Sequence, residues 1–390
     1  MNRCLLFLFL VFTASASAQS YKTIHDKAIV IDTHNDVIST CIEKGYRFDS
    51  DLQGKTHSDL KRMFQGGLDA QMFSIYCDGT QEQPFAFANR EIDTLYAWVK
   101  RNPDSMMLVT SPEELNTAVQ QHKLAAMIGV EGGHMIEDDL DKLEALYKRG
   151  TRYLTLTWNN SNNWATSAED ETDTSKKLEH KGLTAFGRTV VQKMNALGMM
   201  VDVSHVGEQT FWDVIATSKK PVIASHSSVY ALAPVFRNLN DEQIRAIAKN
   251  GGVIQLNFYP VFLDSTAERK QRTFFRRHKD ERDSLRASGM ANLAIQEWLF
   301  SHYADEAKQM QTPLSVLIDH VDHIVRLVGV DYVGLGGDFD GISTTPAELT
   351  DVRKYPLITK ALLERGYKKK DVEKILGGNF IRVFKANQPH

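Results

Sequence analysis

Two kinds of hydrophobic pattern alternate along the chain from about residue 27 onward. Short apolar runs, many of them rich in Val, Ile, Leu and Met, are typical of strands that are buried on both faces. Amphipathic runs, with apolar residues three or four positions apart, separate most of these strands and predict helices. The predicted strands cover residues 27–36, 70–76, 124–130, 153–157, 199–203, 221–225, 253–257 and 332–336, and the predicted helices include residues 86–100, 139–148, 183–196, 241–249 and 314–327.

Repetition of strand and helix eight times predicts a parallel barrel with helices outside, the (β/α)8 TIM-like barrel of the α/β class. Boundary signals agree with this pattern: Asn240 is expected to cap the helix at 241–249, and Gly251 to end it. A doubly wound open sheet has the same periodicity and is the alternative fold. We favour the barrel because it gathers the carboxyl ends of all strands around one mouth, and polar residues follow those ends.

Side chains that can bind a metal follow most of the predicted strands. His34 and Asp36 end the first strand, and both point the same way because side chains alternate along a strand. Glu131 follows the third strand, His205 the fifth and His226 the sixth. The spacing between the last two histidines is about one strand–helix repeat, so equivalent positions on neighbouring strands are expected.

Three imidazoles and two carboxylates suit a pair of divalent ions with one carboxylate bridging them. Zinc is the usual ion for such nitrogen and oxygen ligands, although manganese or cobalt is chemically acceptable. Two such ions would hold a shared water as hydroxide and polarise a carbonyl, so the implied reaction class is hydrolysis. Taken alone, Glu131 could be a loop residue, and His205 and His226 could be hydrogen-bonded core histidines. Five such coincidences at strand ends are much less probable than one.

Asp338 closes the eighth predicted strand within the sequence Gly336-Gly-Asp-Phe-Asp-Gly341. The glycines fit a close backbone approach to the site, and an aspartate there could move a proton between the attacking water and the leaving amine. The alternative is a turn aspartate, a role that fits Asp340 better.

Composition and charge restrict the partners. With 42% hydrophobic and 24% charged residues and a formal net charge of -3, the chain gives no reason to expect nucleic acid or an anionic membrane as partner. We expect one barrel domain over residues 19–390, interrupted by a helical insertion at about 260–312 that covers the mouth or forms a subunit contact, as in a homodimer. The basic cluster at 276–279 is expected to be a solvated helix face, because acidic residues follow it.

Residues 1–18 are expected to be a cleaved secretory signal peptide, since Arg3 precedes an apolar stretch and small residues end at Ala18. The mature protein is then exported, to a periplasmic or extracellular location. No later stretch has the apolar length of a membrane span, and the polar C-terminus lacks a lipid-anchor signal, so a soluble protein without a membrane anchor is expected. Cys41 and Cys77 remain in the mature chain as one possible disulfide pair.

Eight motifs together resemble the membrane dipeptidase (renal dipeptidase) family of the amidohydrolase superfamily. The resemblance runs in the family's order from about Lys27 to Phe384. The motifs are Ile31-Asp-Thr-His-Asn-Asp36, Gly129-Val-Glu-Gly-Gly-His134, Asp202-Val-Ser-His205, Ala224-Ser-His-Ser-Ser228, Arg237-Asn-Leu239, Gly251-Gly-Val-Ile-Gln-Leu-Asn-Phe-Tyr259, Asp322-His-Ile324 and Gly336-Gly-Asp-Phe-Asp-Gly341.

The resemblance implies a binuclear zinc dipeptidase on a (β/α)8 barrel, with two Zn2+ per subunit. His34 and Asp36 would hold one zinc, His205 and His226 would hold the other, and Glu131 would bridge them and take part in catalysis.

The resemblance also implies substrate contacts. Arg237 would pair with the dipeptide's terminal carboxylate, for which a guanidinium is well shaped, although a surface arginine is the alternative. Asp338 would serve as acid and base and grip the free amine. Tyr259, the last residue of its motif, would contact the substrate, as would Trp158.

Trp158 departs from the family's pattern. The family usually reads Leu-Thr-His where this chain reads Leu156-Thr-Trp158, and that histidine is expected to support the charge that develops on the attacked carbonyl. The indole has one N–H donor and no titratable group. It could still donate, or Asn159 or Asn160 could replace the histidine.

Three functions therefore follow from the sequence. The first is an exported zinc dipeptidase that accepts a D-residue at the C-terminal position, as the family does. The second keeps the metals but acts on N-acyl amino acids, a lactam or another small amide. The third is a metal-loaded binding protein with reduced turnover, because Trp158 replaces the family's histidine.

Overall fold

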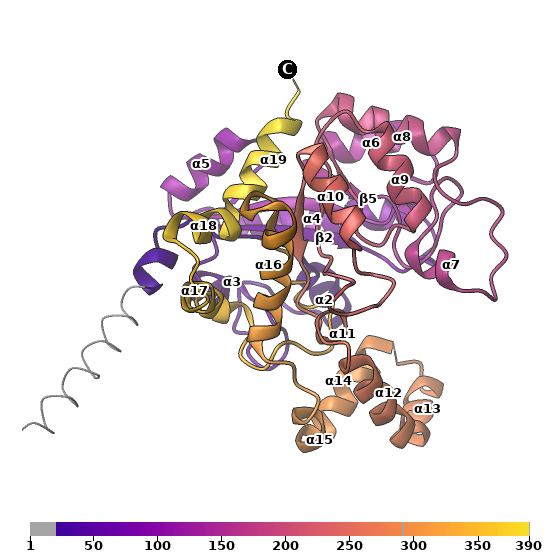
Figure 1. Ribbon diagram of the computed structural model, residues 1–390, viewed down its shortest axis with the longest axis vertical. Helices are drawn as coiled ribbons and strands as arrows, with labels where there is room; N and C mark the ends of the chain where they lie inside the picture. Colours follow the sequence, from indigo (N-terminus) through magenta and orange to yellow (C-terminus); the bar gives the residue numbers. More distant parts are fainter. Residues whose placement is uncertain (1–20, 291, 390) are drawn as a thin grey trace, which may run out of the picture.

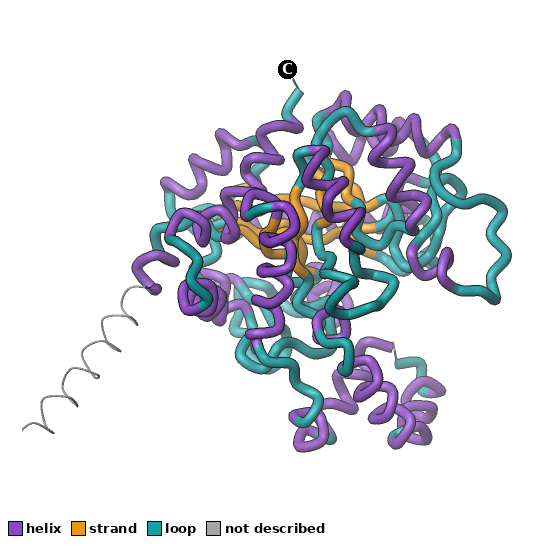
Figure 2. The backbone as a smooth tube through the Cα atoms, viewed as in Figure 1, coloured by secondary structure: helices purple, strands orange, loops and turns teal. Residues whose placement is uncertain are grey.

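The computed structural model describes residues 21–290 and 292–389, so the expected signal peptide lies outside the described residues. Figure 2 shows the strands gathered at the centre of the molecule with helices around them. The strands of the main path are β1 (Ile31–Asn35), β2 (Ala70–Tyr76), β4 (Leu124–Glu131), β5 (Thr151–Thr155), β6 (Met200–Asp202), β7 (Ile223–Ala224), β8 (Val253–Leu256) and β9 (Val333–Leu335).

The strand order is that of a barrel. Each strand pairs in parallel with the next in the order β1-β2-β4-β5-β6-β7-β8-β9. The two ends of this path meet, because Asn35 and Phe339 form a parallel bridge and the Asp36 N–H donates to the Phe339 carbonyl over 3.0 Å. A doubly wound sheet reverses its strand order and keeps two free edges. The (β/α)8 barrel is therefore confirmed, and the open-sheet alternative is wrong.

One strand was not predicted. β3 (Met106–Leu108) pairs with β4 outside the main path. It follows α4 (Pro84–Arg101) and precedes α5 (Pro112–Gln120), a region in which the sequence analysis named the helix at 86–100 alone. A run of three residues is too short to show a strand period, so pairing with β4 rather than local pattern defines it.

The outer helices agree with the predicted ones to within a few residues. The Asn240 side chain accepts from the Gln243 N–H while the Gln243 side chain accepts from the Asn240 N–H, which confirms the expected cap, and Gly251 ends the helix at a φ of 82°. The remaining helices outside residues 260–308 are α2 (Val37–Lys44), α3 (Leu60–Gln65), α6 (Leu140–Lys148), α7 (Ala168–Thr172), α8 (Ala185–Leu197), α9 (Glu208–Thr217), α10 (Asp241–Asn250), α16 (Leu314–Val328), α17 (Tyr355–Glu364), α18 (Lys369–Glu373) and α19 (Asn379–Asn387).

Residues 260–308 contain five helices, of which α12 to α15 gather at one end of the molecule, away from the strands (Figure 1). A small apolar cluster that includes Phe274, Leu299 and Phe300 holds them together. The helices are α11 (Pro260–Leu263), α12 (Ala267–Arg277), α13 (Lys279–Ala287), α14 (Asn292–His302) and α15 (Ala304–Lys308).

Side chains of α12 and α14 contact the barrel near its mouth. Gln271 accepts from the Tyr259 hydroxyl over 3.0 Å and donates to Thr344 over 3.3 Å, and Lys44 lies 3.8 Å from Glu297. Tyr259, Thr344 and Lys44 belong to segments that leave the carboxyl ends of β8, β9 and β1. The insertion therefore lies beside the mouth of the barrel.

The basic cluster at residues 276–279 lies on a solvated helix surface. Arg277 pairs with Glu306, and Lys279 pairs with Asp283 at 2.5 Å. Both basic side chains are more than half exposed, at 61% and 62%. These ion pairs on a solvated face agree with the expectation drawn from the acidic residues that follow the cluster.

Two sequence questions are answered by the fold. Cys41 and Cys77 are both buried and free, so they do not form a disulfide. Among the described residues, none of the helices combines the length and the apolar character that crossing a membrane requires.

The buried carboxylate of Asp32 links the first strand to the last by hydrogen bonds. Asp32 is fully buried, and its carboxylate accepts from the His34 N–H over 3.0 Å, from the Gly337 N–H over 2.9 Å and from the Tyr355 hydroxyl. His34 and Gly337 lie at the carboxyl ends of β1 and β9, where the barrel closes. The Asp32 carboxylate is thus part of the framework on which the site is built.

Replacing Asp32 with Ala is expected to lower the free energy of unfolding by about 3–5 kcal/mol, since two buried N–H groups lose their acceptor at roughly 1–3 kcal/mol each. Chemical denaturation measures the change. Asp51→Ala is the control, because Asp51 is exposed and its carboxylate accepts the N–H of nearby Gln53 over 3.0 Å. Equal unfolding midpoints for the two variants would contradict this role for Asp32.

Candidate active site

The structure brings the five predicted ligand residues together at the mouth of the barrel. Glu131 lies at their centre: its Oε1 is 2.9 Å from His205 Nε2 and 3.3 Å from His226 Nε2, and its Oε2 is 3.4 Å from His34 Nε2. Asp36 Oδ2 also lies 3.4 Å from His34 Nε2, so the two side chains do point the same way at the end of β1. All five are at most 8% exposed.

A hydroxyl group fixes the ring orientation of His34. His34 Nδ1 lies 2.9 Å from the Tyr153 hydroxyl, which donates its own proton to the Thr33 carbonyl over 3.1 Å. The hydroxyl must therefore accept from Nδ1–H, so Nε2 is the ring atom left to face the centre. This atom is directed at Glu131 and Asp36.

The other two histidines are held in the same way. His226 Nδ1 lies 2.8 Å from the Ser225 hydroxyl, and that hydroxyl donates to Asp202 over 2.6 Å. His205 Nδ1 lies 3.0 Å from the Asn159 amide oxygen, which can only accept. Both rings therefore carry their proton on Nδ1 and present Nε2 to the centre. Such outer partners are typical of metal-binding histidines.

The donor atoms left at the centre fit a metal. The Nε2 atoms of His205 and His226 lie 2.9 Å apart, and two lone pairs cannot hydrogen-bond to each other. His34 Nε2 and Asp36 Oδ1 are buried without a hydrogen-bond partner. A cation between these atoms would satisfy all of them, because neutral imidazole and carboxylate are common ligands of divalent ions.

Ligand atoms of two groups of three residues lie within 4.8 Å of one another. The first group is His34, Glu131 and His226, and the second is His34, Asp36 and Asp338. The second group adds Asp338 to the possible ligands, a role that the sequence analysis did not assign to it.

The charges at the site also favour a cation. Burial lowers the pKa of His205 to about 4, with Arg237 adding to the effect, and burial likewise lowers the pKa of His226. Both imidazoles are therefore neutral at physiological pH, which is the form that binds metal. Burial would lower the pKa of His34 as well, but nearby Tyr153, Glu131 and Asp36 raise it well above its ordinary value. The acidic groups around His34 thus stabilise a positive charge at the centre.

Asp338 lies against the same centre. It follows β9 by three residues in a left-handed conformation with a φ of 59°, and its N–H donates to the His34 carbonyl over 3.0 Å. Asp338 Oδ1 lies 3.9 Å from His34 Nε2. Burial raises the pKa of Asp338 well above its usual range, and the neighbouring carboxylates of Asp36 and Glu131 add to this. Asp340, in contrast, accepts the His57 N–H over 2.6 Å, which fits the turn role.

Arg237 is buried at 5% exposure, so the alternative of a surface arginine is wrong. Its Nη2 donates to the His226 carbonyl over 3.3 Å, and its guanidinium lies 5.4 Å from the Phe262 ring centroid. Its Nε is buried without a partner. Burial lowers its pKa to about 10, so it remains a cation at neutral pH. A buried cation with a free donor beside the centre suits an anionic ligand group.

Trp158 lies close to His205, one of the candidate metal ligands. Its ring is 5.1 Å from that of Tyr76, edge to face, and 6.5 Å from that of His205. The Asn159 amide oxygen faces His205, and the Asn160 amide donates to the Ser161 carbonyl over 3.3 Å. Replacement of the family's histidine by the indole of Trp158 or by either asparagine stays a prediction.

Sequence reasoning missed the residues that support the site. Tyr153, Asn159 and Asn257 hold His34, His205 and Asp338, respectively. A polar residue at the end of an apolar run was the only available signal, and Asn257 alone shows it clearly. Tyr153 lies inside an apolar run and resembles an ordinary core residue.

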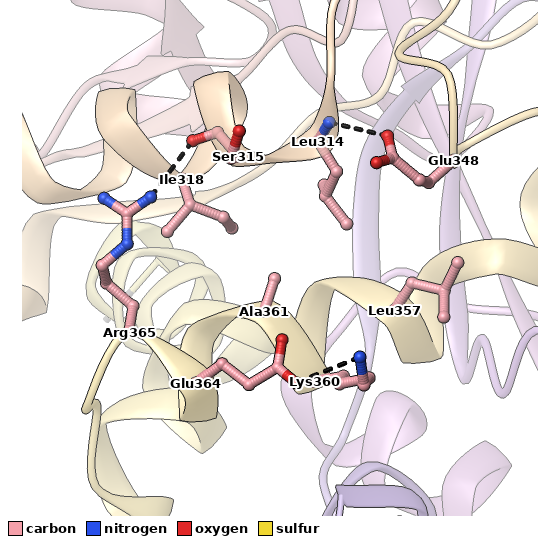
Figure 3. Close-up of a pocket in the computed structure, with 9 residues that line it drawn as sticks. All are labelled: Leu314, Ser315, Ile318, Glu348, Leu357, Lys360, Ala361, Glu364 and Arg365. Carbon is pink, nitrogen blue, oxygen red and sulfur yellow. Dashed lines mark hydrogen bonds and ion pairs between the residues drawn. The ribbon is translucent and has the colours of Figure 1, made fainter.

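A separate hollow of about 330 Å³ lies between α16 and α17 in the outer layer (Figure 3). Its polar groups are already paired: the Leu314 N–H donates to Glu348 over 2.8 Å, and Lys360 lies 3.0 Å from Glu364. It lies between outer helices rather than at the mouth. We therefore place the chemistry at the mouth of the barrel.

Fold and site together define a metal-dependent hydrolase of the (β/α)8 class. The sequence model of the membrane dipeptidase family, peptidase family M19, matches residues 18–389, and the chain belongs to this family. An uncharacterized dipeptidase of Schizosaccharomyces pombe is 32% identical over 389 residues, covering 95% of this chain and 83% of the relative. The protein is thus a metallopeptidase that hydrolyses peptide bonds.

Solved structures share the fold. The probable dipeptidase PvdM of Pseudomonas aeruginosa superposes with a TM-score of 0.77 at 25% identity, over 96% of this chain and 99% of that one. A metallopeptidase of Rhodobacter sphaeroides, solved with a phosphinate mimic of the dipeptide L-Ala-D-Ala, superposes with a TM-score of 0.74 at 23% identity, over 93% and 100% of the two chains.

Proposed function

We propose that the protein is an exported dipeptidase with two zinc ions at the mouth of the barrel. The observation that carries the proposal is the convergence of three imidazole nitrogens and two carboxylates around Glu131. His34 and Asp36 would hold one ion, His205 and His226 would hold the other, and Glu131 would be shared between them. The pattern of residues 1–18 supports export.

The remaining residues bind the substrate and move protons. When bound, the two ions supply an activated water and polarise the scissile carbonyl. Arg237 pairs with the terminal carboxylate of the dipeptide, and Tyr259, whose hydroxyl donates to Gln271 of the insertion, contacts the substrate. Asp338 takes the proton of the attacking water and gives it to the leaving amine. Asp338 also grips the free amino group of the substrate.

Tolerance of a D-residue on the carboxyl side is part of this proposal. The complex of the Rhodobacter sphaeroides relative with an L-Ala-D-Ala mimic supports it. Arg237 would recognise the carboxylate whichever way the neighbouring side chain points.

A second candidate substrate class comes from Trp158. Its indole stands 6.5 Å from the His205 ring, where the family usually has a histidine. An apolar wall there would suit N-acyl amino acids or another small amide. Side-by-side assays of dipeptides and the matching N-acyl amino acids separate the two classes. A wild-type protein that is inert while Trp158→His is active would instead identify a binding protein with reduced turnover.

Metal analysis and a dipeptide panel test the proposal. We expect purified protein to hold about two zinc ions per chain, in keeping with five nitrogen and oxygen ligands. A chelator should remove the ions and abolish hydrolysis of L,L- and L,D-dipeptides, and zinc should restore it. Protein that binds no metal, or metal-loaded protein that cleaves no dipeptide, would contradict the proposal.

A further inference from the structure

Asn257 makes two short hydrogen bonds at the end of β8. It is fully buried, its Oδ1 accepts from the Tyr259 N–H over 2.6 Å, and its Nδ2 donates to Asp338 Oδ2 over 2.7 Å. Because a backbone N–H can only donate, Oδ1 must face Tyr259, and the NH2 group must therefore face Asp338. The orientation of the amide is fixed by this pairing.

The two oxygens of Asp338 consequently have different surroundings. Oδ2 is held by the amide of Asn257, whereas Oδ1 lies 3.9 Å from His34 Nε2. A methyl group added at Gly341 would come within 2.5 Å of Asp338 Oδ1 and 2.2 Å of Asp36 Oδ2. Oδ1 of Asp338 therefore shares a small space with a proposed metal ligand, whereas Oδ2 is bonded to the Asn257 amide.

We propose that Asn257 is a positioning residue that fixes the rotation of the Asp338 carboxylate and keeps Oδ1 turned toward the candidate metal ligands. This inference rests on the proposed function, in which Asp338 moves a proton. Other rotations of the carboxylate would leave the buried NH2 group of Asn257 without its acceptor. The observed rotation keeps the bond to Asn257 on Oδ2 and places Oδ1 3.9 Å from His34 Nε2.

The positioning role has an energetic reason. A carboxylate free to rotate would spend part of its time with the reactive oxygen misdirected, and misplacement of a catalytic group by about 1 Å can cost about a hundredfold in rate. Partners that hold catalytic and metal-binding groups typically contribute about 10- to 100-fold. Asn257 does not need to touch the substrate to have this effect.

The experiment compares Asn257→Ala, Asp338→Asn and the double variant, all loaded with zinc. We expect Asn257→Ala to lower kcat about 30-fold while KM stays within about twofold and bound metal is unchanged. In the Asp338→Asn background, the further change at Asn257 should have no effect on kcat, because the two residues act as one unit. Crystal structures should show the Asp338 carboxylate turned in Asn257→Ala.

Asn379→Ala is the matched control. Asn379 is also buried, and its amide donates to the carbonyls of Val330 over 2.7 Å and Val333 over 2.8 Å. Val333 begins β9, so these bonds lie at the barrel end opposite the site. This variant should lose stability but keep kcat within about twofold. If Asn257→Ala does not fold, the isosteric Asn257→Asp keeps the acceptor for Tyr259 and removes the donor, and its kcat should fall at least as far.

Several results would overturn the inference. One is that kcat of Asn257→Ala is no lower than kcat of Asn379→Ala. Another is that the decrease in kcat of the double variant equals the product of the decreases caused by the two single substitutions. An unmoved Asp338 in the crystal structure of Asn257→Ala would also overturn it. Wild-type protein that cleaves no dipeptide would instead overturn the proposed function, and the crystal structures still decide whether Asn257 orients Asp338.

Discussion

Glu131→Gln is expected to lower kcat/KM by at least about a thousandfold, because it removes the only charge that all three histidines share. Glu131 Oε1 and Oε2 lie 2.9–3.4 Å from the Nε2 atoms of His34, His205 and His226. An amide of the same shape offers one acceptor instead of two and cannot bridge two cations. Metal ions typically supply several kcal/mol of transition-state stabilisation, and each 1.4 kcal/mol is about a factor of ten.

Metal content and activity of Glu131→Gln are measured together. We expect bound zinc to fall as well as turnover, while the thermal unfolding midpoint in the presence of chelator changes little. Glu91→Gln is the matched control: Glu91 is fully buried, burial raises its pKa well above its usual range, and its Oε2 accepts the Tyr76 N–H over 2.7 Å. An amide imitates that neutral acid, so metal and activity should persist. Normal zinc content and turnover in Glu131→Gln would contradict the bridging role.

The barrel and the cluster of donors could be predicted because both follow from local pattern. Alternation along β1 puts His34 and Asp36 on one side, and the structure places them 3.4 Å apart. Glu131, His205 and His226 each lie at or just after a strand end, so closing the barrel is enough to bring them together. The period of the hydrophobic pattern could not predict that the barrel closes, because closure depends on contacts such as that between Asn35 and Phe339.

Contacts with a distant partner escaped prediction. The resemblance gave Arg237 a role, but Arg237 follows β7 in a loop, and only tertiary packing shows that it is buried against Phe262. Asn159 contacts His205, which lies 46 positions later in the sequence, and Asn257 contacts Asp338, which lies 81 positions later. No spacing rule relates such pairs, because the distance between them along the chain depends on helix and loop lengths rather than on a repeat.

Arg237→Ala is expected to lower kcat/KM for dipeptides by about 100- to 1,000-fold and to abolish the preference for a free carboxylate. The guanidinium is buried, cationic at neutral pH and has an unpaired Nε, so a substrate carboxylate would complete its hydrogen bonds. Losing one partner of a buried, hydrogen-bonded charge pair typically costs about 2–5 kcal/mol. Each dipeptide is compared with its C-terminal amide, which keeps the shape and removes the charge.

The wild-type enzyme should prefer the acid over the amide, whereas Arg237→Ala should cleave both at similar low rates. Arg152→Ala is the control, since Arg152 is another buried arginine, at 8% exposure, whose pKa burial also lowers. Its bonds go to the carbonyls of Thr110, Tyr147 and Thr151 near the start of β5, away from the mouth. Its loss should reduce stability and leave the acid-to-amide ratio unchanged. An acid preference that survives in Arg237→Ala would show that another group binds the carboxylate, and the substrate would then lie in the opposite direction across the two proposed ions.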